Sequence, residues 1–184
     1  MATAADLLTG LRFALSIAIF LVTAAGILPA TSVLVAAAWL TDLLDGRLAR
    51  RAKGETRLGS LDPIVDALVG VAIIAGLARA GSLAVGVAVI VIGGLGAWYL
   101  MTRIVTLLMI LQALAYATLF WHFYQQQTDL WWVSVGVAMF ITAVDARRLF
   151  SSILPVFFGG FRRLVLGDDA RSEVRSVDVA EDEA

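Results

Sequence analysis

The sequence predicts an all-α integral membrane protein with six transmembrane helices and both termini in the cytoplasm. Sixty per cent of the 184 residues are hydrophobic, 16% are charged, and the mean hydropathy is +0.89. Soluble domains carry about 25% charged residues. The chain contains no cysteine and one histidine, His122, which excludes disulfides, thiolate metal sites and imidazole clusters. Any metal ion is therefore expected to bind through oxygen ligands.

Six apolar stretches are the predicted membrane helices, because a helix needs about 20 mostly apolar residues to cross a bilayer. Charges, glycines and prolines separate these stretches. They cover residues 10–28, 32–48, 58–78, 82–100, 103–121 and 131–149. The first stretch has Arg12 near its start but no strongly basic leader, so we interpret it as a membrane helix and not as a cleaved signal peptide.

Basic residues mark alternate ends of these helices, as expected for cytoplasmic ends under the positive-inside rule. Arg12 lies at the start of the first helix, Arg103 between the fourth and fifth, and Arg148 at the end of the sixth. Only Arg79 lies at an opposite end. The sequence therefore predicts a multi-pass protein of the cell membrane.

A change in composition near residue 150 predicts two regions. Residues 1–150 form the six-helix transmembrane domain, and residues 151–184 form an interfacial segment followed by a mobile cytoplasmic tail. The interfacial segment mixes bulky apolar residues with Arg162 and Arg163. The sequence from Asp168 onward is polar and acidic without apolar periodicity, which is typical of a disordered tail.

Four aspartates flank a basic segment between the second and third predicted helices. Asp42 and Asp45 are three positions apart and Asp62 and Asp66 are four apart, so each pair lies on one face of its helix. A short helical hairpin would bring both pairs together. Four carboxylates carry a charge that two divalent cations balance, and oxygen ligands suit Mg²⁺ or Mn²⁺. The alternative is a set of helix-end carboxylates paired with the neighbouring arginines.

Small and basic residues lie among these aspartates. Gly46 and Ala49 leave room for a ligand beside the helix, and Gly59 does so on the next helix. Arg50 offers a fork of donors that suits a phosphate oxygen. This combination favours chemistry on a phosphorylated substrate whose lipid part stays in the membrane.

The segment resembles the signature of the CDP-alcohol phosphotransferase family, D-x2-D-G-x2-A-R-x8-G-x3-D-x3-D. The match is in register from Asp42 to Gly59, and the interval from Gly59 to Asp62 is one residue shorter than in the family. Both intervals keep one helical face, so the departure affects the role of Gly59 more than those of the aspartates. The amino-terminal sequence ADLLTGLRF and the six predicted helices are also similar to the family.

The resemblance implies that the four aspartates hold two Mg²⁺ or Mn²⁺ ions and that Asp66 is also the general base. Residues that it implies for binding the cytidine diphosphate part are Gly46, Ala49 and Arg50. The implied reaction is attack by an acceptor hydroxyl on the phosphorus attached to the lipid alcohol of CDP-diacylglycerol, with release of CMP, in phospholipid biosynthesis. The resemblance also implies a homodimer, and nucleic acid is not an expected partner.

The acceptor is the open part of this interpretation. Size and layout resemble phosphatidylglycerophosphate synthases, so we expect glycerol 3-phosphate. Arg103 is a candidate for binding its phosphate, although an interfacial arginine that snorkels to the surface is an equal alternative. Other acceptors are inositol phosphate, serine or a phospholipid, and a further alternative is a non-catalytic membrane homologue. Asp145 is interpreted as a local ion-pair partner of Arg148 and not as part of the site.

A cation transporter is the rival interpretation from another functional class. Transport sites lie near the middle of the membrane, between discontinuous helices. The four aspartates instead cluster at one predicted face of the membrane, beside an arginine-rich segment. The sequence therefore favours the phosphotransferase.

Overall fold

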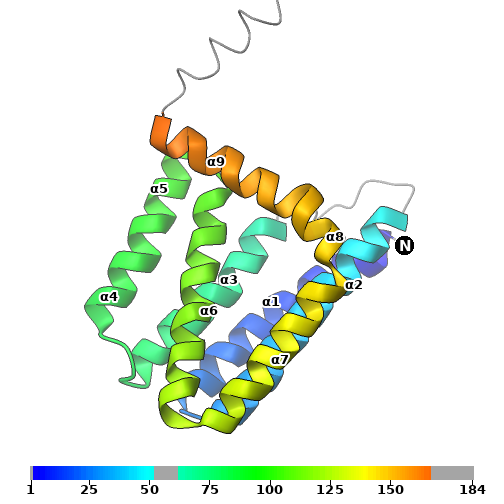
Figure 1. Ribbon diagram of the computed structural model, residues 1–184. Coiled ribbons are helices and arrows are strands. Elements are labelled where there is room, and N and C mark those ends of the chain that lie inside the picture. Colours follow the sequence, from blue (N-terminus) through cyan, green and yellow to red (C-terminus); the bar gives the residue numbers. More distant parts are fainter. Residues whose placement is uncertain (1, 52–61, 167–184) are drawn as a thin grey trace, which may run out of the picture.

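The computed structural model describes residues 2–51 and 62–166, and all regular structure within these ranges is helical (Figure 1). The helices are α1 (Ala2–Ala24), α2 (Leu28–Arg51), α3 (Asp62–Arg79), α4 (Val85–Val89), η1 (Ile90–Gly94), α5 (Leu95–Thr102), α6 (Thr106–Gln126), α7 (Thr128–Val144), α8 (Ala146–Arg148), η2 (Leu149–Ile153) and α9 (Leu154–Leu166). The prediction of an all-α protein is confirmed over these ranges.

Each of the six predicted stretches overlaps a described helix, although two are composite. The fourth covers α4, the π-helical turn η1 and α5, and in the sixth Asp145 separates α7 from α8. Two continuous helices are long and apolar enough to cross a membrane, Val85–Thr102 and Thr106–Gln126. A third candidate is the pair Asp129–Val144 and Ala146–Val165, which is bent by 70°. Shorter apolar helices cover Thr9–Ala24 and Leu28–Leu44. The described helices are thus those of an integral membrane protein with two or three candidate spans by length and composition.

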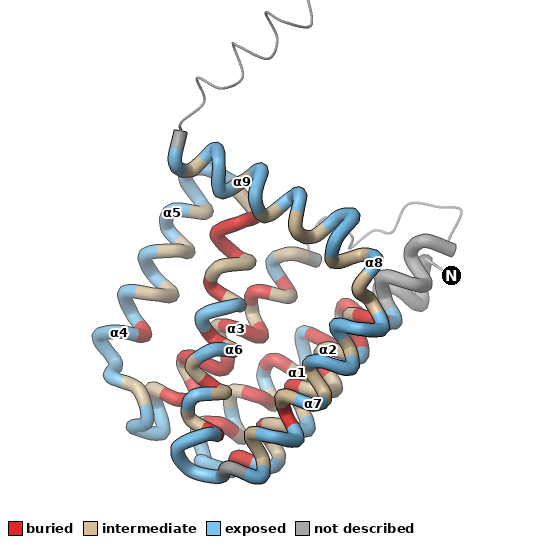
Figure 2. The backbone as a smooth tube through the Cα atoms, in the orientation of Figure 1, coloured by how far each residue is buried: buried red, intermediate tan, exposed pale blue. Residues whose placement is uncertain are grey.

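The buried core lies between α1, α2, α3 and α6, whereas α4 and α5 are mostly exposed at one edge of the bundle (Figure 2). Helices α1 and α3 approach each other closely at Gly76, where an added Cβ would lie 2.7 Å from the Cβ of Thr23. Only glycine fits this position without displacing a neighbour. Thr23 lies eleven residues after Arg12, and Gly76 lies ten residues after Asp66. Because both helices rise by about 1.5 Å per residue, the register set at Gly76 also places Arg12 beside Asp66.

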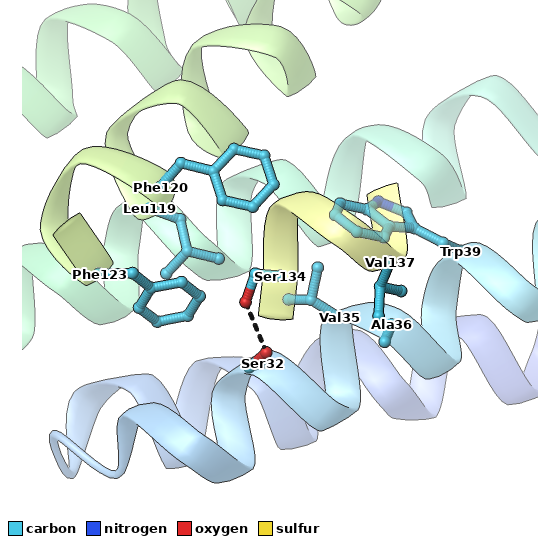
Figure 3. A pocket seen from close by; sticks show the side chains of 9 residues that line it. All are labelled: Ser32, Val35, Ala36, Trp39, Leu119, Phe120, Phe123, Ser134 and Val137. Atoms are coloured by element: carbon cyan, nitrogen blue, oxygen red, sulfur yellow. Dashed lines mark hydrogen bonds between the residues drawn. The ribbon is translucent and has the colours of Figure 1, made fainter. Parts of the chain in front are cut away.

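A pair of hydroxyls joins α2 to α7. The side-chain oxygens of Ser32 and Ser134 are 2.8 Å apart beside a small cavity of about 10 Å³, as the dashed line in Figure 3 shows. Trp39 lines the same cavity about two turns further along α2. Its ring packs edge-on against Tyr116 of α6, with the ring centroids 5.1 Å apart. These contacts fix Trp39, which is also a wall of the larger cavity described below.

The carboxy-terminal helix α9 lies across the end of the bundle, over the start of α6 (Figure 1). Gly160 permits this contact, since an added Cβ would lie 1.8 Å from the hydroxyl oxygen of Thr106. Apolar side chains of α9, including Phe158 and Phe161, remain exposed, as expected for an interfacial segment. The predicted mobile tail, from Asp168 onward, lies outside the described residues.

Candidate active site

A cavity of about 540 Å³ is lined by residues of α1, α2, α3, α6, α7, α8 and η2. Its charged lining comes from separate parts of the chain: Arg12 on α1, Asp42 on α2, Asp66 on α3 and Arg148 on α8. The remaining lining is largely apolar and aromatic. The cavity therefore combines carboxylates and arginines with walls suited to the apolar part of a substrate.

Arg12 connects the two aspartates. Its side chain is only 1% exposed. The Nη1 atom of Arg12 pairs with Oδ1 of Asp66, and Nη2 lies 3.5 Å from Oδ1 of Asp42. The two carboxylates are partly exposed, at 40% for Asp42 and 28% for Asp66, so only the arginine charge is buried. One guanidinium thus joins the helices that carry the two halves of the aspartate motif.

A second arginine, Arg148, which comes much later in the sequence, also contacts Asp42. Nη1 of Arg148 is 3.6 Å from Oδ2 of Asp42 and 3.5 Å from Oδ2 of Asp145. The predicted local ion pair between Asp145 and Arg148 is therefore confirmed. Because Arg148 also contacts Asp42, it links the segment after α7 to the aspartate cavity, which its ion pair with Asp145 alone would not do.

The polar part of the α6 wall faces the same space. Nε2 of Gln112 donates a hydrogen bond of 3.1 Å to the hydroxyl oxygen of Tyr116. Both residues line the cavity, and Trp39 covers the ring of Tyr116. The helix α6 therefore contributes an amide and a phenol close to the two carboxylates.

The structure places the predicted site residues in three groups. Asp42 and Asp66 come together at the cavity, as expected. A second group lies on the described helices while their side chains fall outside the described part: Asp45, Gly46, Ala49 and Arg50, in the last two turns of α2, and Asp62, the first residue of α3. Gly59 lies outside the described residues altogether.

Arg103 is not brought to the aspartate cavity. It caps the end of α5 with φ of 56°, a left-handed backbone conformation that residues other than glycine rarely adopt. It lines a neighbouring hollow of about 530 Å³ together with Arg163 of α9. Val105 lines both spaces, so the hollow adjoins the aspartate cavity.

Comparison with known proteins assigns this arrangement to a family. A family model for CDP-alcohol phosphatidyltransferases matches residues 2–144, which include every helix up to α7. The chain belongs to the CDP-alcohol phosphatidyltransferase family. Searches of curated proteins and of solved structures found no significant match.

Membership in the CDP-alcohol phosphatidyltransferase family determines the class of reaction. Members are transferases of substituted phosphate groups that move a phosphatidyl group from a CDP-alcohol to an acceptor. They are membrane enzymes of phospholipid biosynthesis and generally depend on divalent metal ions. A CDP-alcohol and an alcohol acceptor are therefore the substrates that the family implies for this chain.

The donor set of a CDP-alcohol phosphatidyltransferase fits divalent metal ions at this cavity. Asp42 and Asp66 present carboxylate oxygens from two helices to one space, which suits hard cations. Within residues 2–51 and 62–166, no three acidic or histidine side chains are grouped as a metal site. The side chains of Asp45, one helical turn after Asp42, and of Asp62, one turn before Asp66, are not among those that the structure describes. Two of the four carboxylates predicted as metal ligands, Asp42 and Asp66, thus face one cavity.

Sequence reasoning missed the part played by Arg12 and Arg148. The sequence presents both as markers of cytoplasmic helix ends, whereas both contact Asp42 and line the cavity. The signal for Arg12 was present, since an ionisable residue inside a membrane helix indicates a functional site. It was obscured because the first helix begins at Ala2, eight residues before the predicted start, so that Arg12 lies well inside it.

Proposed function

We propose that the chain transfers a phosphatidyl group from CDP-diacylglycerol to glycerol 3-phosphate and releases CMP, as a phosphatidylglycerophosphate synthase would. The observation that carries this proposal is the convergence of Asp42 and Asp66 with two arginines on one cavity. Arg148 lines the cavity and is 30% exposed, so its guanidinium suits an acceptor that carries a phosphate. An anionic acceptor is therefore favoured over a neutral alcohol.

In this proposal Asp66 accepts the proton of the acceptor hydroxyl. The hydroxyl oxygen forms a bond to the phosphorus attached to the lipid alcohol, and the bond from that phosphorus to the phosphate of CMP breaks. Two Mg²⁺ or Mn²⁺ ions, when bound by the four aspartates, would supply charge neutralisation and orientation of the reacting phosphates. Gly46, Ala49 and Arg50 hold the CDP part on α2, with Gly59 leaving room opposite. Arg103 binds the acceptor phosphate from the adjoining hollow.

The test is release of CMP by the purified protein in nanodiscs with CDP-diacylglycerol and Mn²⁺ or Mg²⁺. The acceptor panel comprises glycerol 3-phosphate, inositol phosphate, inositol, serine and phosphatidylglycerol. We expect release with glycerol 3-phosphate, and inositol phosphate paired with inositol shows whether a phosphate on the acceptor is needed. Release of CMP with serine or phosphatidylglycerol, and not with glycerol 3-phosphate, would show that the proposed acceptor is wrong. No release with any acceptor would favour a non-catalytic homologue.

We further propose six membrane spans with both termini in the cytoplasm, a catalytic domain of residues 1–150 and a separate carboxy-terminal region of residues 151–184. The support for this topology is the placement of Arg12, Asp42, Asp66 and Arg148 at one end of the bundle. That end is the cytoplasmic one in this proposal, which places the cavity on the side where CDP-diacylglycerol meets a soluble acceptor. The loop between α6 and α7 then lies on the opposite side of the membrane.

A homodimer is proposed from the exposed edge of the bundle. The glycine-rich run around Gly93 and Gly96 predicts close helix packing, yet no described atom of the same chain lies within 4 Å of an added Cβ at either position. An apolar hollow of about 710 Å³ beside Ile92 borders the same helix. A second copy would supply the missing packing partner.

Single cysteines test topology and assembly together, because the native sequence has no cysteine. We expect Gln125→Cys and Ser152→Cys to react with a membrane-impermeant thiol reagent from opposite sides of oriented vesicles. We expect Gly93→Cys to form a cross-linked dimer, and Gly136→Cys, which also has open space around it, to serve as the matched control. Labelling of Gln125→Cys and Ser152→Cys from the same side would contradict the topology. Equal cross-linking at Gly93 and Gly136 would contradict the interface.

A further inference from the structure

Arg12 lies outside the aspartate motif, yet its side chain occupies the centre of the site. It projects from α1, whereas Asp42 and Asp66 lie on α2 and α3. Its guanidinium pairs with one oxygen of Asp66 and lies 3.5 Å from one oxygen of Asp42, and the side chain is 1% exposed. A charged side chain buried within a helix of a membrane protein requires such compensation, so both carboxylates account for its position.

The geometry of this contact is specific to arginine. A guanidinium is planar and presents several N–H groups in a fixed fork, so its Nη1 and Nη2 atoms can address two carboxylates at a fixed separation. A lysine ammonium carries the same charge on a single atom and cannot fix the separation in the same way. The guanidinium thus contacts both carboxylates at once, through a hydrogen bond to Asp66 and at an ion-pair distance of 3.5 Å from Asp42.

We infer that Arg12 is a positioning residue for the metal site: it holds Asp42 and Asp66 at the separation at which both can share divalent cations. This inference rests on the proposed function, because it takes these aspartates as metal ligands. Carboxylates that bind metals are themselves held by outer hydrogen bonds, and loss of such a bond typically lowers metal affinity or activity by about 10–100-fold. Arg12 reacts with neither substrate nor metal in this role and acts through the two aspartates.

Binding of Mn²⁺ in the absence of substrate tests the inference, measured by electron paramagnetic resonance on the full chain in nanodiscs. We expect Arg12→Gln to raise the dissociation constant for Mn²⁺ by about 10–100-fold. We expect Arg12→Lys to weaken binding also, because it restores the charge but not the fork. The matched control is Arg79→Gln, an exposed arginine at the far end of α3, for which we expect an unchanged constant.

The possible outcomes distinguish the positioning role of Arg12 from the proposed metal site on which it rests. Unchanged or tighter Mn²⁺ binding by both Arg12 variants would overturn the positioning role. Wild-type affinity of Arg12→Lys, with weaker binding by Arg12→Gln, would show that only the positive charge of Arg12 matters and would overturn the role of its guanidinium geometry. If Arg12→Gln does not fold, as judged by thermal unfolding, Arg12→Lys still decides the matter. Absence of Mn²⁺ binding by the wild-type protein would instead overturn the proposed metal site.

Discussion

Replacing Asp66 by asparagine is expected to lower acceptor-dependent CMP release by about 10²–10⁴-fold, the usual contribution of a positioned general base. Asparagine has nearly the same shape as aspartate, but its amide cannot accept the proton of the acceptor hydroxyl. It also replaces a carboxylate that pairs with Arg12 and faces the cavity. The measurement is the rate of CMP release with CDP-diacylglycerol and glycerol 3-phosphate at saturating Mn²⁺.

The control for this substitution is Asp129→Asn. Asp129 is an exposed aspartate in the first turn of α7, at the end of the bundle opposite the cavity. We expect its activity to equal that of the wild type. Thermal unfolding of both variants distinguishes loss of chemistry from loss of fold. Activity of a folded Asp66→Asn variant close to that of the wild type would rule out Asp66 as the base.

Removing divalent cations with a chelator is expected to reduce CMP release to the uncatalysed background, and Mg²⁺ or Mn²⁺ is expected to restore it. Without the cations, the clustered carboxylates repel the phosphates of the substrate, because nothing neutralises the combined negative charge. Arg12 is buried and already engaged with both carboxylates, so it does not replace the cations. The rate is measured as the free metal concentration is varied.

The variant Asp42→Asn tests one proposed metal ligand in the same experiment. The substitution removes one carboxylate from the proposed ligand set, so we expect the metal concentration for half-maximal activity to rise by at least about tenfold. Asp129→Asn is again the matched control. An unchanged metal requirement in a folded Asp42→Asn variant would exclude Asp42 as a ligand, and full activity in the presence of the chelator would exclude the metal-dependent mechanism.

The aspartate convergence was predictable because it follows from local spacing and topology alone. Spacings of three and four residues place carboxylates on one helical face, and a helical hairpin returns the chain to the same end of the bundle. The structure brings Asp42 and Asp66 to one cavity accordingly. The all-helical class was equally accessible, since apolar stretches of this length have few other solutions in a membrane.

The contacts between distant segments were not predictable in the same way. Arg12 and Asp66 are separated by 54 positions, and their pairing depends on how closely α1 and α3 pack at Gly76. Arg148 reaches Asp42 because the chain bends by 70° after α7, and hydropathy carries no information on such a bend. Residues of this kind resemble topology markers in the sequence and become site residues only when the helices are packed.

The separation of Arg12 from its partner has a consequence for how the chain is made. At about 5–20 residues per second, the ribosome would deliver Asp66 roughly 3–10 s after Arg12. During that interval the carboxylate of α3 that pairs with Arg12 has not yet been made. The ion pair that joins the first and third helices therefore forms only once the third helix has been synthesised, so the site is completed after the first two helices have been made.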